Sequence, residues 1–128
     1  MSPDKFGVTY DFELLDADGN LVDSWQVKNL VPLDGVNHLA AAMFGDTPAI
    51  GNFHVGVFAG NYLPTMDSKA ADIPSAMSEF VGYSEATRPV WQRLNTDGVI
   101  SNAHARAAFT LTANATLYGG LLSSSAVK

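Results

Sequence analysis

The sequence contains no cysteine, few charged residues and no long apolar run. Without cysteine, disulfide bonds, zinc sites with thiolate ligands and cysteine nucleophiles are all excluded. No stretch approaches the roughly 20 apolar residues that a membrane-spanning helix needs. No apolar segment follows a basic start, as it would in a signal peptide. The composition therefore predicts a soluble protein with no membrane partner, and it fits a reducing compartment.

Positive charge is also scarce, since 7 lysines and arginines stand against 13 acidic residues, for a net charge of −6. Binding to a phosphate backbone needs a basic surface, so we expect no nucleic-acid partner. Charged residues make up 16% of the chain and apolar ones 47%. A surface poor in charge is easily desolvated, which suits a subunit that packs against neighbours. An ordinary compact domain rich in small residues explains the composition equally well.

The clearest pattern in the chain is an alternation of apolar and polar residues over residues 5–15. Such alternation places the apolar side chains on one face of a strand. Residues 16–20, which include Gly19 and Asn20, are typical of a tight turn. Residues 21–31 have the pattern of the returning strand. We therefore predict a long β-hairpin over this part of the chain.

After the hairpin, the pattern predicts one short helix over residues 35–44, capped by Asp34 and ended by Gly45. Several short strands separated by turns follow, which is typical of a β-sandwich or barrel. The length of 128 residues fits one mainly β domain over residues 1–128. The further elements are a strand buried on both faces at 52–59, a loop at 60–78 with a helical turn near Ala70, strands at 79–84, 87–94, 106–113 and 116–123, a turn at 95–98, and short terminal arms at 1–5 and 123–128.

A calcium loop is the first chemical motif to consider, because Asp16, Asp18 and Asn20 follow its opening spacing. The pattern then needs a glycine and a bidentate glutamate, and Leu21 and Val27 stand at those positions. Residues 16–20 are therefore better explained as a hairpin turn than as a metal site.

Catalytic motifs are incomplete as well. His38, His54 and His104 have no metal-ligand spacing among them. The stretch from Gly82 to Ala86 contains a serine but lacks the second glycine of a nucleophile elbow. No dinucleotide-binding or phosphate-binding glycine loop occurs. We therefore predict a protein that is not an enzyme, with no catalytic, metal or cofactor-binding residue.

Aromatic residues and one cation gather at Phe80, Tyr83, Arg88 and Trp91. Tryptophan, tyrosine and arginine dominate the hot spots of protein interfaces. Phe80 and Trp91 are expected to pack in the core of the protein. For Tyr83 and Arg88, core packing and contact with a partner remain equal alternatives.

The same region carries a family resemblance, which extends from about Asn29 to Leu122. Its most specific part is the stretch from Phe80 to Trp91, with Gly82-Tyr83-Ser84-Glu85-Ala86-Thr87-Arg88-Pro89 inside it. These segments resemble a family of small virion proteins of tailed phages. The other segments that carry the resemblance are Asn29-Leu30-Val31 with Gly35-Val36-Asn37-His38-Leu39, Phe53-His54-Val55-Gly56-Val57-Phe58, Asn61-Tyr62 with Pro64-Thr65, Ile100-Ser101-Asn102, and Leu117-Tyr118-Gly119-Gly120-Leu121-Leu122.

The resemblance implies a jelly-roll-like β-sandwich with one short helix that acts as a capsid cement, or decoration, protein of a short-tailed phage. Such a protein sits on the outer capsid and clamps neighbouring subunits of the major capsid protein. The implied partners are that capsid protein and further copies of the chain, as a dimer or another symmetric oligomer. The implied location is the capsid surface of the virion, after synthesis in the cytoplasm of a bacterial host. The family implies no catalytic residues.

Two alternatives stay open. The first is a tail, neck or baseplate component with the same virion-structural character. A small carbohydrate-binding module or hydrolase would instead use Trp25 and Trp91 as exposed platforms for a sugar. The residues expected to contact a partner are Tyr83, Arg88, Tyr62, Met1, Ser2, Pro3, Val127 and Lys128.

Overall fold

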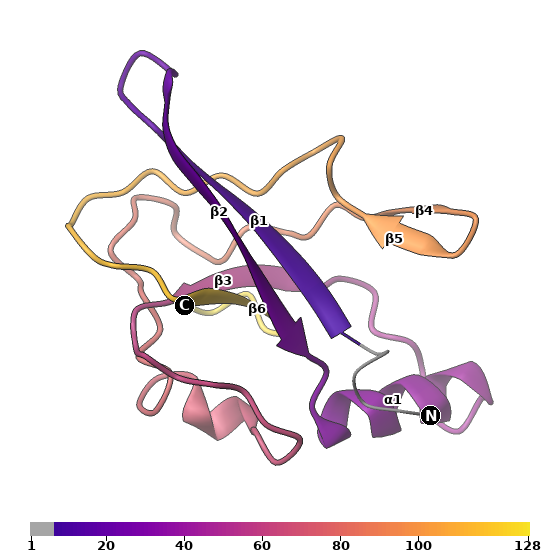
Figure 1. Cartoon of the computed structure of the whole chain (residues 1–128). Helices are drawn as coiled ribbons and strands as arrows, with labels where there is room; N and C mark the ends of the chain where they lie inside the picture. The colour runs from indigo at the N-terminus through magenta and orange to yellow at the C-terminus, as the bar shows by residue number, and fades with distance from the viewer. Residues whose placement is uncertain (1–6) are drawn as a thin grey trace.

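The computed structural model describes residues 7–128 (Figure 1). Within these residues the strands form three antiparallel pairs, β1–β2, β3–β6 and β4–β5, accompanied by one α-helix. The prediction of a mainly β chain with one helix is confirmed. The elements are β1 (Gly7–Leu15), β2 (Leu21–Leu30), α1 (Leu33–Met43), β3 (His54–Phe58), the 3-10 turn η2 (Ala70–Asp72), β4 (Leu94–Thr96), β5 (Val99–Ser101) and β6 (Gly119–Ser123).

The predicted hairpin is confirmed as β1–β2, whose pairing runs from Gly7 opposite Leu30 to the turn. The Asp16 carboxylate closes that turn by accepting hydrogen bonds from the backbone N–H groups of Asn20 at 2.8 Å and Asp18 at 2.9 Å. These bonds lower the pKa of the Asp16 carboxyl, and the bond from the Asn20 backbone has the largest effect. Gly19 supplies the positive φ, at +85°. Asp16 is therefore occupied within the turn, as the hairpin interpretation requires.

Strand β3 is buried on both faces, as predicted, and it divides the core into two clusters. Successive residues of a strand point to opposite faces. Val57 therefore packs with Phe80 and Tyr83, whereas Phe58 packs with Met77 and Leu121 on the other side. The half-buried Phe12 of β1 contacts the first cluster.

Two glycines of β6 let aromatic rings lie against its backbone. A Cβ at Gly119 would lie 2.5 Å from Phe58 Cζ, and one at Gly120 would lie 2.6 Å from Tyr10 Cδ1. The first ring belongs to β3 and the second to the hairpin, which crosses the β3–β6 pair (Figure 1). Asn29 Nδ2 adds a hydrogen bond of 3.0 Å to Gly120 O. The paired glycines thus fix how closely the hairpin approaches β6.

Helix α1 differs from its prediction at one end. It begins at Leu33 with Pro32 as N-cap, so the prediction of Asp34 as the cap is wrong. Asp34 lies in the first turn and forms an ion pair of 2.9 Å with Lys69. Gly45, with φ at +82°, follows the helix end as expected. No helix formed by residues 7–128 is long and apolar enough to cross a membrane.

The predicted strands at 79–84, 87–94 and 106–113 are wrong. Apart from Leu94, which begins β4, these segments make single bridges, in which Glu79 pairs with Phe58, Tyr83 with Leu111 and Val90 with His54. Each bridge pairs with a different part of the chain, so no continuous ladder of backbone hydrogen bonds forms. Pro89 also has no N–H with which to continue one.

Two further predictions are corrected in part. The predicted strand at 116–123 is shortened to β6 at its end. The predicted turn at 95–98 is the turn of the β4–β5 hairpin, where Asp97 and Gly98 have positive φ. The helical turn expected near Ala70 is confirmed as η2.

We predict that Gly119→Ala lowers the free energy of unfolding by about 1–3 kcal/mol, since the added methyl group has no space beside Phe58 and forces a shift in the packing. Phe58 is 1% exposed and cannot move into solvent. Urea unfolding followed by tryptophan fluorescence measures this loss. Gly51→Ala is the matched control, because a Cβ there meets no atom within 4 Å. Equal stability of both variants would contradict the argument.

Candidate functional site

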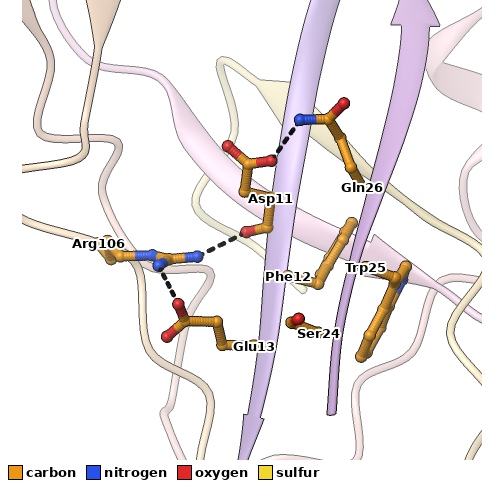
Figure 2. Close-up of a pocket in the computed structure, with 7 residues that line it drawn as sticks. All are labelled: Asp11, Phe12, Glu13, Ser24, Trp25, Gln26 and Arg106. Atoms are coloured by element: carbon orange, nitrogen blue, oxygen red, sulfur yellow. Dashed lines mark hydrogen bonds and ion pairs between the residues drawn. The ribbon is translucent and has the colours of Figure 1, made fainter. Parts of the chain in front are cut away.

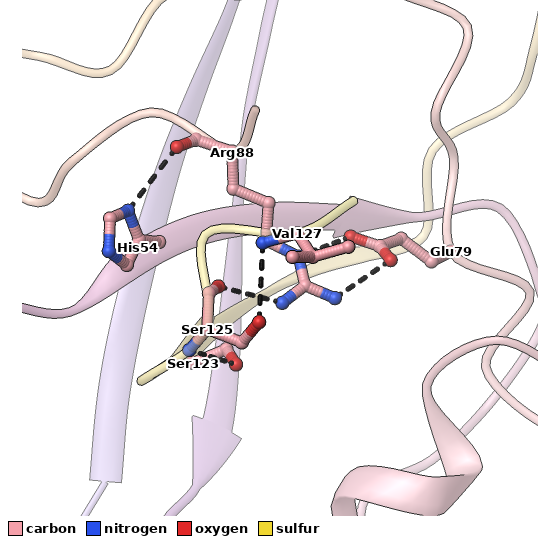
Figure 3. Close-up of polar contacts among 6 residues, drawn as sticks. All are labelled: His54, Glu79, Arg88, Ser123, Ser125 and Val127. Carbon is pink, nitrogen blue, oxygen red and sulfur yellow. Dashed lines mark hydrogen bonds and ion pairs between the residues drawn. The ribbon is translucent and has the colours of Figure 1, made fainter. Parts of the chain in front are cut away.

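Arg88, one of the predicted contact residues, forms a buried ion pair with Glu79 (Figure 3). Its Nε donates to Glu79 Oε2 at 2.6 Å and its Nη2 to Oε1 at 2.8 Å. Both side chains are 6% exposed. Hydrogen bonding to the Glu79 carboxylate raises the pKa of the Arg88 guanidinium further above its usual range. In this conformation the Arg88 side chain is bound inside its own chain and offers almost no surface to a partner.

Tyr83 lies in the same region and is 3% exposed. Its ring packs edge-on against Phe109, with centroids 4.9 Å apart, and tilted against Phe80. The buried Oη has no hydrogen-bond partner among the described residues. Burial raises the pKa of this phenol. Of the two alternatives for Tyr83, the structure places the side chain in the core.

The C-terminal segment, residues 123–128, covers both side chains. Ser125 O accepts a hydrogen bond of 2.9 Å from Arg88 Nη1, and Ala126 O accepts one of 2.9 Å from Arg88 N. Lys128 Nζ donates to the carbonyl of Tyr83 at 2.8 Å and lies 4.2 Å above its ring. The predicted arm thus packs against its own chain, while Val127 is 73% exposed. Any contact of Arg88 or Tyr83 with a partner would require this segment to move.

Tyr62, the remaining internal contact residue, is half-buried. Its Oη lies 2.6 Å from Ser68 Oγ, and its ring packs edge-on against Phe58. It therefore helps to hold the loop at 60–78 on the core. Met1, Ser2 and Pro3, the predicted N-terminal contacts, lie outside the described residues. A role of these residues in partner binding stays a prediction.

The three histidines do not come together as a metal site within the described residues, which contain no group of three or more potential metal ligands. His54 Nδ1 lies 3.3 Å from the carbonyl oxygen of Arg88, which orients its ring (Figure 3). His38 lies on α1 and His104 in an exposed loop.

A hollow of about 430 Å³ lies beside the hairpin and was not expected from the sequence (Figure 2). Its charged groups are paired with one another: Arg106 forms a 2.9 Å ion pair with Glu13 and donates to Asp11 O at 2.8 Å. Gln26 Nε2 donates to the Asp11 carboxylate at 2.7 Å. Such pairing leaves few polar groups to recognise a small ligand. The Trp25 ring stacks on Phe12 with centroids 5.1 Å apart, so it is not a free platform.

Exposed apolar surface is the most prominent feature of the described chain. The accessible area of the whole chain, polar and apolar atoms together, is 8457 Å². A compact monomer of the same mass, 13.6 kDa, is expected to expose about 6,600 Å². Nine of the 17 exposed large apolar side chains lie in three places: the tip of the β1–β2 hairpin with Leu15, Leu21 and Val22, the end of α1 with Leu39, Met43 and Phe44, and the β4–β5 hairpin with Leu94, Val99 and Ile100.

Sequence reasoning did not identify these three places, although the low charge content pointed to a surface that is easily desolvated. An apolar residue in a strand or helix is ordinarily assigned to the core. A comparison with known proteins finds no matching family model, no similar curated protein and no similar solved structure. The resemblance to phage virion proteins therefore stays a prediction.

The buried ion pair predicts an asymmetric response to mutation. Arg88→Met should lower the free energy of unfolding by about 3–5 kcal/mol, because Glu79 is left charged and buried. The double variant Glu79→Leu/Arg88→Met should recover part of that loss. Urea unfolding of the single and double variants gives the coupling energy.

The Arg106–Glu13 pair is the matched control, since its side chains are 43% and 45% exposed. Breaking this pair with Arg106→Met should change the free energy of unfolding by less than about 1 kcal/mol. Strictly additive losses at Arg88 and Glu79 would contradict the prediction.

Tyr83→Phe should leave stability at pH 7 unchanged or raised, because the removed hydroxyl has no partner. The phenol ionises at about pH 10 in the unfolded chain but only at higher pH when folded. The free energy of unfolding of the wild type therefore decreases as the pH rises above about 10. The decrease should be smaller in Tyr83→Phe, which lacks this phenol. Urea unfolding at pH 8 and pH 11 measures it. A large loss at pH 7 would indicate an unseen partner of the hydroxyl.

Proposed function

We propose that the chain is a structural protein of a tailed-phage particle, and specifically a capsid cement protein that clamps neighbouring subunits of the major capsid protein. In this role it performs no catalysis and uses no cofactor. The observation that carries the proposal is the exposed apolar surface, which a free monomer would not retain. The resemblance of the sequence to small virion proteins supplies the setting.

The size of that surface supports binding to another protein. The chain exposes about 1,900 Å² more than expected for its mass. Each partner of a standard stable interface contributes roughly 800 Å². The excess, which counts polar and apolar area together, equals a little more than two such contributions. A clamp between two capsid subunits needs two contact areas on one small protein, and contact with a second copy of the chain would also use this surface.

The strand arrangement is compatible with such a role. Two-stranded sheets are marginally stable in water unless other elements cover them or extend them. The jelly-roll sandwich implied by the resemblance would require the pairs to be extended, for instance by the segments at 79–94 and 106–113 that already run beside them. That finer architecture is part of this proposal.

The rivals differ in how well the observations support them. A tail, neck or baseplate component would need the same exposed apolar surface, and microscopy of labelled particles separates it from a cement protein. A sugar-binding module has less support. Trp25 and Trp91 are each half-buried against an aromatic ring of their own chain, Phe12 and Phe53 respectively.

The purified protein should bind phage capsids that lack it and raise the temperature at which they break open. Sedimentation measures binding, and release of packaged DNA on heating measures disruption. The temperature of capsids without added protein is the reference. Presence of the protein in tails alone would remove the cement assignment, and absence from particles would remove the proposal as a whole.

A further inference from the structure

We infer that the tip of the β1–β2 hairpin, residues 14–23, inserts into an apolar groove of the partner protein whose rim carries lysine or arginine. The inference rests on the proposed function, because it names the contact surface that the protein would use on the capsid. Three observations support it: the tip projects from the rest of the chain, it is apolar on both faces, and its charge has one sign.

The tip is unusual in lacking a polar face. Leu14 of β1 is 38% exposed and, as the neighbour of Leu15 along the strand, points to the opposite side of the hairpin from Leu15. Leu21 and Val22 of β2 are 59% and 61% exposed, and a register shift beside Leu14 and Leu15 leaves Val22 without a paired residue. Leu15, opposite Leu21, is 52% exposed. The tip extends beyond the neighbouring segments (Figure 1). A flat partner surface would cover one face and leave the other in water. A groove that encloses the tip would bury both.

A hollow adjoins the tip and extends the same surface. It has a volume of about 490 Å³ and lies between Leu14 of β1 and residues 111–115. Leu111 is 42% exposed, and Ala113 and Ala115 are exposed as well. Its lining, in which Thr112 and Asn114 stand among these apolar residues, can accept a side chain from the wall of the partner's groove. The apolar side chains of the tip and this hollow together form a continuous surface, and well-packed interfaces achieve complementarity through such surfaces.

The charge of the tip selects the kind of partner. Residues 14–23 contain Asp16, Asp18 and Asp23 and no lysine or arginine. Asp16 is bound within the turn, whereas Asp18 and Asp23 are exposed beside the apolar side chains. Two copies of the tip brought together would place like charges side by side, which is unfavourable. Nucleic acid and an anionic membrane are disfavoured for the same reason. A protein groove with a basic rim is complementary.

The test uses capsid shells of the encoding phage, prepared without this protein, and the full chain. Leu21→Thr/Val22→Thr keeps β-branched residues in the strand but removes apolar contacts, and it should weaken binding about tenfold or more. Asp18→Lys/Asp23→Lys should weaken binding most at low salt, where charge attraction is strongest. The matched controls are Leu63→Thr/Val81→Thr, again one leucine and one valine but outside the three apolar places, and Asp67→Lys, an exposed aspartate away from the tip; both should bind as the wild type does.

The outcomes separate the two proposals. Wild-type binding with unchanged binding of the tip variants would overturn the hairpin inference and leave the cement function standing. Failure of the wild type to bind shells would overturn both. Circular dichroism verifies that each variant is folded. Should the double variant unfold, a photo-crosslinking amino acid at position 22 replaces it. Its attachment to the major capsid protein supports the inference, and attachment from position 99 but not from position 22 overturns it.

Discussion

The arrangement of this chain depends on the close approach of two aromatic rings to the backbone of β6. Gly119 and Gly120 have no Cβ, so the Phe58 ring and the Tyr10 ring occupy the space that side chains would otherwise fill. One ring comes from β3 and the other from the β1–β2 hairpin. Each strand pair alone would be marginal. The two glycines allow the strand pairs to pack against each other, and this packing sets the position of the hairpin tip.

The Arg88–Glu79 pair performs a related task for the irregular part of the chain. Segments 79–91 and 124–128 form no continuous ladder and are held by scattered backbone hydrogen bonds, such as that from Arg88 N to Ala126 O, so side chains contribute more to their positions. Arg88 binds Glu79 through two bonds and Ser125 through a third. A buried pair of this kind contributes little net stability, since desolvation opposes the attraction. Its geometry instead fixes where the C-terminal segment lies, and with it the covering of Tyr83.

Local signals in the sequence were sufficient for some elements and not for others. The hairpin was predictable because alternation and the Asp16–Asn20 turn lie within one short segment. The strands at 79–94 were mispredicted because their partners change at every bridge, which no local pattern reveals. The two alternatives for Arg88 could not be separated either, since burial depends on Glu79 and on a carbonyl of Ser125, far along the chain. The tip residues looked like ordinary strand residues.

A small core and a large apolar surface have one physical origin in this chain. Apolar side chains that lie at the hairpin tip, the end of α1 and the β4–β5 hairpin are withdrawn from the core, so the free protein gains less from burial than its composition allows. A partner that covers them would supply the missing burial, and binding would then raise the stability of the folded chain by mass action. The acidic residues at the tip disfavour contact between two tips. In the proposed role, the low charge elsewhere would keep the desolvation cost of a protein contact small.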